Sequence, residues 1–362
     1  MTSKTIANGI IRAVLILVLI AVLIYFVYQL QSVIAYILIA AVISLIGKPI
    51  VDFLHDKLKF KQLIAVIVTM MLFLGIFMGI IGLLIPLLLE QGQNLSLLDI
   101  DELRLSIEGL YIQSIEYLDL HHINANKAID ESNILSNLDY GLIPNFLNSL
   151  LSGLGSFGIG LLSVLFIAFF FLKDSKLFRN GILIFVPKRN ELKVKHSLLQ
   201  ISQLLSRYFV GLFFQLFILF VIYTIGLFIV GAENAVVIAF LCALVNIIPY
   251  LGPLIGGVLM LFLVTTDNLA ADFETVVLPK LFLTIIVITV GQLIDNFFSQ
   301  PFIFSRSVKS HPLEIFLIII IAGLLFGVIG MIVAVPAYTA IKVILKEFLS
   351  DYKFVEKLTQ GL

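Results

Sequence analysis

The sequence predicts an all-α polytopic membrane protein, with about six full spans, two opposed re-entrant helical hairpins and an extramembrane helical insert. The first observation behind this fold class is composition, since 60% of the 362 residues are hydrophobic and only 13% are charged. Soluble domains are about 45–50% apolar and about 25% charged. The second observation is a series of apolar runs of spanning length, and the third is the segregation of basic residues into a few segments.

Residues 1–89 are predicted to hold the N-terminal spans. Ile10–Tyr28 and Leu63–Leu89 are long enough to cross a bilayer, because a transmembrane helix needs about 20 apolar residues. The run Val33–Ile46 between them is shorter. Ile10–Tyr28 exceeds the apolar stretch of a signal peptide and has no clear small-residue cleavage site after it. We therefore interpret it as an uncleaved first span.

An insert at residues 90–149 interrupts the apolar pattern with ten acidic residues against two basic ones. Its apolar residues recur at helical spacing, as at Leu103, Ile107 and Leu110. This spacing predicts an amphipathic, mostly helical segment outside the membrane. A further span is predicted at residues 150–172.

A basic linker at residues 173–207 is predicted to be cytoplasmic or interfacial. Within it, Leu192–Leu205 is amphipathic, and we expect this stretch to lie on the membrane surface. Residues 208–346 form the predicted transport core, and residues 347–362 a cytoplasmic tail. The core comprises, in order, a span at Tyr208–Val230, a hairpin at 235–266, a span at 276–299 and a hairpin at 312–345.

The hairpins follow from the distribution of charge. Of the 23 basic residues, all but Arg104, Lys127 and Lys280 fall at the two termini, in the linker, or in the loops after the second apolar run and after the 276–299 span. Basic residues favour the cytoplasm, so both termini are predicted to be cytoplasmic. Segment 235–266 must then begin and end outside, and segment 312–345 must begin and end inside. An arm of about 14 helical residues spans about 21 Å, less than the ~30 Å hydrocarbon core, so re-entrant hairpins fit better than full spans.

A span plus an outside hairpin, followed by a span plus an inside hairpin, is an inverted repeat of the kind found in many secondary transporters. Irregular backbone at membrane depth is tolerated only when it is buried in protein or faces water. The half-helix ends at such breaks offer unpaired N–H or C=O groups to a polar solute. The sequence therefore predicts a transport pathway between the two hairpin tips.

Asp295 is the sharpest candidate residue, because an intramembrane carboxylate is costly and usually functional. Gln292, Asn296 and Gln300 share one helical face, and Asp295 lies beside that face. This polar stripe is predicted to face a solute or cation, or to exchange a proton. The alternative is that Asp295 reaches the inner interface or pairs with a nearby basic residue, Arg306 or Lys309.

Both hairpin tips are candidate lining segments. Proline removes a helix donor, and glycine permits tight turns and close approach of helices. An amide such as Asn246 also suits a polar solute. The alternative for both tips is that they serve only turning and packing. The candidates of the first tip are Asn246, Pro249, Tyr250, Gly252 and Pro253, and those of the second tip are Gly323, Gly327 and Gly330.

Several chemistries have no motif in this sequence. There is no G-x-x-x-x-G-K-[ST] loop for an ATP-driven motor, no Cys–His metal spacing and no nucleophile elbow. We therefore expect no enzyme activity, no cofactor, no catalytic or metal site and no nucleic-acid partner. The energy source must be an ion gradient, the solute's own gradient or a partner protein.

Four stretches resemble the autoinducer-2 exporter family of bacterial permeases, most closely from about Leu150 onward. Against that family's pattern the chain has no Trp, and it has Asp rather than Glu at position 295. The resemblance implies an inner-membrane transporter, exporting autoinducer-2 or exchanging Na⁺ or Li⁺ for H⁺, that forms pentameric homo-oligomers and moves in an elevator-like way. The stretches are FFFLKDSKLFRNGILIFVP (Phe169–Pro187), NIIPYLGPLIGG (Asn246–Gly257), QLIDNFFSQPFIFSRSVKSHPL (Gln292–Leu313) and GLLFGVIGMIVAVP (Gly323–Pro336).

Three functions remain open from the sequence. The first is export of a small polar solute such as autoinducer-2 by alternating access, and the second is Na⁺(Li⁺)/H⁺ antiport with Asp295 as the titrating group. The third is a non-transporting membrane scaffold whose acidic insert at 90–149 binds a partner. The expected partners are the lipid bilayer, a small polar solute, Na⁺ or H⁺, and further copies of the chain.

Overall fold

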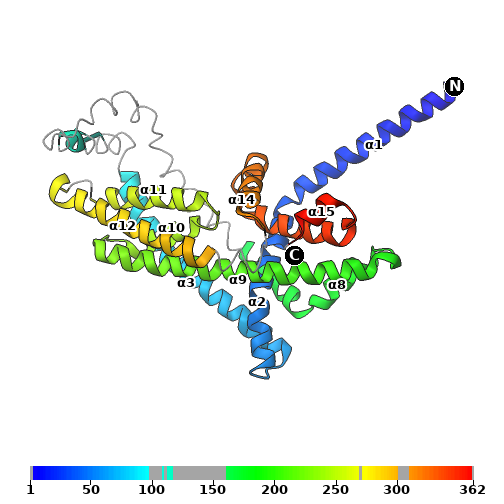
Figure 1. Ribbon diagram of the computed structural model, residues 1–362, viewed down its shortest axis with the longest axis horizontal. Helices are drawn as coiled ribbons and strands as arrows, with labels where there is room; N and C mark the ends of the chain where they lie inside the picture. Colours follow the sequence, from blue (N-terminus) through cyan, green and yellow to red (C-terminus); the bar gives the residue numbers. More distant parts are fainter. Residues whose placement is uncertain are drawn as a thin grey trace. The chain divides into compact units, whose positions relative to one another are not determined.

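The computed structural model describes residues 3–97, 108–109, 112–116, 160–268, 271–300 and 310–360. The described residues are helical and contain no strand (Figure 1). The elements are α1 (Ser3–Gln29), α2 (Gln31–Asp56), α3 (Gln62–Leu97), an apolar helix at Gly160–Lys173, α8 (Ser175–Ile184), η1 (Lys188–Asn190), α9 (Glu191–Val230), α10 (Ala235–Val245), α11 (Leu251–Thr266), η2 (Phe273–Val277), α12 (Leu278–Ile294), η3 (Asp295–Ser299), α14 (Pro312–Leu349) and α15 (Lys353–Leu358).

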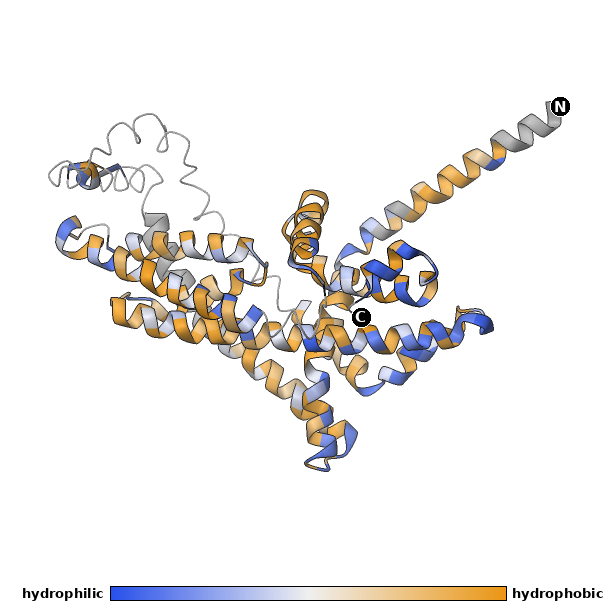
Figure 2. Ribbon diagram, viewed as in Figure 1, coloured by the Kyte–Doolittle hydropathy of each residue, from blue (hydrophilic) through white to orange (hydrophobic). Residues whose placement is uncertain are grey.

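Helices of spanning length and composition confirm the predicted all-helical, multi-pass membrane architecture. Figure 2 shows apolar residues around most sides of these helices, as expected for surfaces that face lipid. Shorter apolar helices include Ile11–Leu23, Gly160–Lys173, α10 and α11. Within the described residues, five segments qualify as spans, namely Gln31–Asp56, Gln62–Gly79, Lys188–Val230, Phe273–Ser299 and Pro312–Leu349.

Most of the predicted insert at 90–149 lies outside the described residues, apart from the end of α3 and two short helical pieces. The same holds for Arg306 and Lys309, the basic residues considered as partners of Asp295. These parts of the sequence-based prediction stay predictions.

The described chain forms two compact units. The first contains α1, α2, the start of α3 and the Gly160–Lys173 helix. Its core is small, formed by Val51, Ala65, Val66 and Leu172. Gln62 Nε2 donates a hydrogen bond to the carbonyl oxygen of Lys173 at 3.2 Å, which satisfies an acceptor at a helix end.

The second unit contains α9 to α15 and is organised around α9. This helix is continuous over 40 residues and ends at Gly231, which adopts a left-handed conformation with φ 73°. At 1.5 Å per residue it is about 60 Å long, twice the hydrocarbon thickness. The predicted surface stretch at Leu192–Leu205 and the predicted Tyr208 span belong to this one helix, and the position of the stretch on the membrane surface stays a prediction. The same helical hydrogen bonding runs through both, so the predicted boundary at 207/208 falls inside one helix.

The first predicted hairpin consists of α10 and α11, which lie beside α9 and α12 (Figure 1). Small residues allow close approach, because a Cβ added at Gly226 would overlap Val287, and one added at Gly291 would overlap Tyr223. The fully buried side chains of this core come from α9, α10 and α11, namely Leu219, Leu227, Ile238, Met260 and Leu263.

Lys280 is one of the three basic residues that lie outside the predicted cytoplasmic segments, and its contacts give a structural reason for its position. Its Nζ donates hydrogen bonds to Asn268 Oδ1 at 2.7 Å and to the carbonyl oxygen of Gly231 at 3.2 Å. These acceptors follow the C-termini of α11 and α9, where helix dipoles favour a cation. Nearby, hydrogen bonds from the Thr275 side chain and backbone to the Asp272 carboxylate lower its pKa and cap the start of η2.

The second hairpin is contained within α14, which reverses at Gly327 with φ 64° and ψ −151°. A Cβ added at Gly330 would overlap the carbonyl oxygen of Ala322, so the two arms touch at the tip. Farther down, Tyr338 donates a hydrogen bond to Glu314 Oε2 at 2.8 Å. In each pair, Ala322 with Gly330 and Glu314 with Tyr338, the two residues lie the same number of positions before and after Phe326. This symmetry is what two antiparallel arms require. The predicted break at 323–330 is therefore a true reversal of the chain, and its depth in a bilayer stays a prediction.

Candidate functional site

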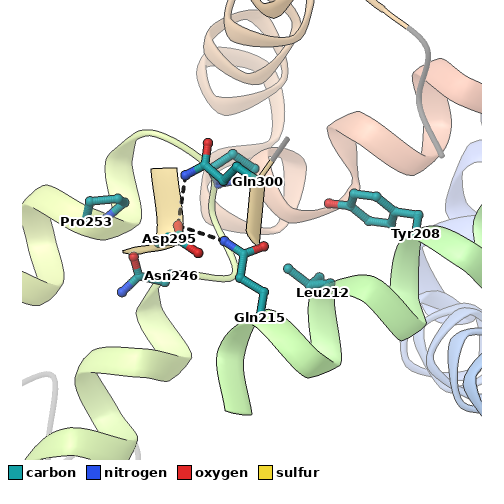
Figure 3. A pocket seen from close by; sticks show the side chains of 8 residues that line it. Tyr208, Leu212, Gln215, Asn246, Pro253, Asp295 and Gln300 are labelled. Carbon is teal, nitrogen blue, oxygen red and sulfur yellow. Dashed lines mark hydrogen bonds between the residues drawn. The ribbon is translucent and has the colours of Figure 1, made fainter. Parts of the chain in front are cut away.

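A small cavity lies where α9, the first hairpin tip and the end of α12 meet (Figure 3). The volume open to the centre of a water-sized sphere is about 10 Å³. This is room for roughly one water molecule or one monovalent cation. The lining residues are Tyr208, Leu212 and Gln215 from α9, Asn246, Pro249 and Pro253 from the hairpin tip, and Asp295 and Gln300 from the last span.

Asp295 is the chemical centre of this cavity. Its side chain is 1% exposed, and its Oδ2 accepts hydrogen bonds from Gln215 Nε2 and Gln300 Nε2, each at 2.9 Å. Its Oδ1 is buried and has no partner among the described residues. No Lys, Arg or His of the described chain forms an ion pair with Asp295. The groups around this carboxylate include the Ser299 side chain beside the two amides, and all of them are neutral. A buried carboxylate with only neutral partners favours a bound proton or cation.

The backbone widens into a π-helical turn, η3, where Asp295 lies. The N–H of Gln300 bonds to the carbonyl oxygen of Asp295, five residues back rather than four. Such turns occur frequently at functional sites. Here the turn brings the amide of Gln300 onto the carboxylate, a contact that a regular helix would not place on one face. The same amide also donates to Asn296 Oδ1 at 3.0 Å, while the Asn296 side chain is exposed and does not line the cavity.

Gln292 links the last span to the first tip and to α9. Its Nε2 donates to the hydroxyl oxygen of Tyr223 at 2.7 Å and to Asn246 Oδ1 at 3.2 Å. Its Oε1 is buried without a partner among the described residues. Asn246 in turn donates from Nδ2 to the carbonyl oxygen of Cys242 at 2.8 Å. Two acceptor oxygens three residues apart, on Gln292 and Asp295, are thus left open on α12 and η3.

The first tip is shaped by its glycines and by a strained turn. A Cβ added at Gly252 would lie 2.5 Å from the carbonyl oxygen of Val245, so no side chain fits there. Tyr250 has φ 66° and ψ −44°, and the N–H of Leu251 donates to the carbonyl oxygen of Pro249 at 2.8 Å. This is a γ-turn of the rare positive-φ type. Pro249 and Pro253 flank the turn and line the cavity, whereas Tyr250 and Gly252 support it.

The second tip does not line this cavity. Gly323, Gly327 and Gly330 allow the two arms of α14 to reverse and pack closely. The hairpins meet elsewhere, where Ile248 of the first tip joins Ile315 and Ile319 in one buried apolar cluster.

The family model of the AI-2E family transporter matches residues 14–350. This chain belongs to that family. "Putative transport protein YrrI" of Bacillus subtilis (strain 168) is 26% identical over 317 residues, covering 86% of this chain and 85% of the relative. "Putative transport protein YueF" of the same organism is 27% identical over 347 residues, covering 91% and 89%. "Putative transport protein BpOF4_00890" of Alkalihalophilus pseudofirmus is 24% identical, covering 84% and 80%. Membership of this family supports a role in membrane transport.

Sequence reasoning missed what α9 contributes to the site of this AI-2E family transporter. Tyr208, Leu212 and Gln215 line the cavity, and Tyr223 accepts the hydrogen bond from Gln292. One signal was available, because Gln215 is the only amide in the apolar span Tyr208–Val230. Polar residues at such positions face the protein interior or a cavity. The others are aromatic or aliphatic and gave no signal.

The γ-turn at Tyr250 yields a prediction for this AI-2E transporter. Both Tyr250→Gly and Tyr250→Ala remove the edge-on contact of the Tyr250 ring with Phe316, whose centroids lie 5.6 Å apart. Only glycine adopts the positive φ without strain, so the Gly variant is expected to be more stable than the Ala variant by about 1–3 kcal/mol. Thermal unfolding in detergent measures the difference.

The matched control is the same pair of substitutions at Tyr352, which has φ −88° and is exposed. At this position the Gly variant should be no more stable than the Ala variant, because the backbone has no positive φ that glycine would relieve. An Ala variant at position 250 as stable as the Gly variant would show that the turn carries no strain.

Proposed function

We propose that this AI-2E family transporter is a secondary transporter that works by alternating access and exchanges a monovalent cation, Na⁺ or Li⁺, for a proton at Asp295. The observation that carries this proposal is the open Oδ1 of a buried carboxylate that faces a cavity the size of one water molecule. A proton and a small cation both neutralise such a group, and they compete for it. Competition at a single carboxylate is sufficient for antiport.

The surrounding groups suit a cation that has lost its water. Carbonyl and carboxylate oxygens are the ligands that hard cations prefer. The open oxygens of Asp295 and Gln292 are such groups, and Asn246 of the hairpin tip accepts a hydrogen bond from Gln292. The amides of Gln215 and Gln300 hold Oδ2 in place, so that the carboxylate keeps a fixed orientation in either protonation state.

A second candidate is export of a small polar solute such as autoinducer-2, and the amides favour it. Gln215 and Gln300 donate to the carboxylate, Asn246 lines the same cavity, and Gln292 donates to Asn246. Amides of this kind can hydrogen-bond to hydroxyl groups. A small-molecule site is usually about 300–1,000 Å³. This candidate therefore requires the hairpin tip to move away from α9 before the solute enters. The cation proposal requires no such enlargement in the present conformation.

The setting of the protein is also part of this proposal. It would lie in the bacterial inner membrane with both termini in the cytoplasm, and α10–α11 and α14 would enter the bilayer from opposite sides as re-entrant hairpins. Charge placement supports the orientation. Homo-oligomers, pentamers by the family resemblance, would cover part of the exposed apolar helix surface.

Flux in proteoliposomes tests these candidates. Purified protein is reconstituted with an imposed pH gradient and an internal pH dye, and NaCl, LiCl or KCl is added outside. We expect Na⁺ or Li⁺ to dissipate the gradient and K⁺ to leave it. Uptake of labelled autoinducer-2 in the same vesicles tests the second candidate. Vesicles that move neither cations nor the solute would contradict both and favour the scaffold hypothesis.

A further inference from the structure

The connection between α8 and α9 carries exposed apolar side chains at its end. We call residues 184–195 the α8–α9 tip. Ile184 is 81% exposed, Phe185 is 90% exposed and Leu192 is 80% exposed. Large apolar groups with so little protein contact need another phase or a partner to cover them.

The α8–α9 tip is also basic. It contains four basic residues and one acidic residue, all exposed. Figure 2 shows this end of α9 as a hydrophilic region beside the apolar residues of the connection. Basic groups around exposed aliphatic and aromatic ones are typical of segments that lie among lipid headgroups. The charged residues are Lys188, Arg189, Glu191, Lys193 and Lys195.

The start of α9 is held to the end of the second hairpin. His196 Nδ1 on α9 lies 3.1 Å from Glu347 Oε2 on α14. Within two turns of Glu347, the α14 side chains Ile341 and Ile344 are 52% and 46% exposed. These apolar side chains need an apolar environment around them, so this part of α14 is expected to lie beside lipid.

The tip begins just beyond the His196–Glu347 pair along α9. Glu191 is five residues from His196 on one continuous helix, a distance of about 7.5 Å along its axis. The headgroup layer on each side of the hydrocarbon is about 5–7 Å thick. A tip this close to a lipid-facing part of α14 can place its exposed apolar and basic residues among the phosphate and glycerol groups.

We propose that the α8–α9 tip is a binding surface for anionic phospholipid headgroups. Phe185 and its apolar neighbours enter the upper part of the leaflet, and Lys188 and Arg189 contact the lipid phosphates. The proposal is independent of what the cavity at Asp295 transports.

The absence of Trp from the sequence allows a direct test. Phe185→Trp places the only Trp of the chain at the tip, and its 90% exposure leaves room for the larger ring. The full-length variant is reconstituted in vesicles containing brominated phosphatidylglycerol or brominated phosphatidylcholine. We expect blue-shifted emission, with quenching at least about twofold stronger by the anionic lipid.

Two matched variants complete the test. Phe228→Trp places a lipid-facing Trp, 62% exposed, on the apolar part of α9, and it should be quenched equally by both lipids. Adding Lys188→Gln and Arg189→Gln to Phe185→Trp should remove the preference for the anionic lipid. Emission at the tip that neither lipid quenches would overturn the proposal, leaving water or a protein partner around the tip. Equal quenching by the two lipids would overturn it as well.

Discussion

Asp295→Asn is expected to abolish cation-coupled transport while leaving the protein folded. The amide keeps an oxygen that accepts from Gln215 and Gln300, so the local hydrogen bonds survive. The negative charge is lost, however, and removing one partner of a buried ion pair costs about 3–5 kcal/mol. Cation affinity should therefore fall by at least about a hundredfold. The pH-dye assay in proteoliposomes measures the loss, and gel filtration with thermal unfolding measures the fold.

Asp272→Asn is the matched control, because Asp272 is an exposed carboxylate that caps η2 at the opposite end of α12. Its variant should exchange Na⁺ for H⁺ at the wild-type rate, since Asn also caps helices well. If the Asp295 variant exchanges cations as fast as wild type, the carboxylate is not the exchange site. The solute-export candidate would then be preferred, provided autoinducer-2 flux is present.

Gly330→Ala is expected to destabilise the second hairpin strongly. The added Cβ would overlap the carbonyl oxygen of Ala322 and lie 2.7 Å from the Cβ of Phe326. The first of these is a backbone atom of the opposite arm, so the arms have to separate. Overpacking of this kind costs about 1–3 kcal/mol or more. Thermal unfolding in detergent should show a lowered midpoint with unchanged oligomeric state.

Gly75→Ala on α3 is the control, because a Cβ there meets nothing within 4 Å. Its stability should be unchanged, or raised by up to about 1 kcal/mol through helix propensity. A Gly330 variant as stable as the Gly75 variant would mean that the arms of α14 are not packed as the structure has them.

The helical pattern of the fold could be predicted because membranes restrict the possibilities. Apolar length gave the helices, and basic residues together with proline and glycine located both reversals of the chain, at Pro249–Gly252 and near Gly327. The continuity of α9 could not be predicted. The amphipathic stretch before Tyr208 differs in composition from the span after it, yet the i to i+4 hydrogen bonding ignores that change. The residue composition of a segment reflects the environment of its side chains, whereas backbone hydrogen bonding determines where a helix ends.

The candidate site was predicted in part. Asp295 was singled out by the cost of an intramembrane carboxylate, and the structure brings it together with Asn246, Pro249, Pro253 and Gln300 around one cavity. The contribution of α9 was missed, because residues 80 positions apart in the sequence, such as Gln215 and Asp295, are joined only by tertiary packing. The Tyr250 turn was predicted as a reversal, but its positive φ at a tyrosine has no signal in the residue type.

The widened turn at Asp295–Ser299 makes this part of the chain sensitive to length rather than to identity alone. Gln300 follows Asp295 by one five-residue turn, so winding the same five residues as a regular helix would turn Gln300 about a quarter of a revolution away from the carboxylate. Removing one residue while restoring the regular helix would keep the amide near the carboxylate, because residues four apart lie on one face of a regular helix. Relatives that keep the carboxylate and the widened turn should carry this amide five positions further on, and relatives with a regular helix here should carry it four positions further on.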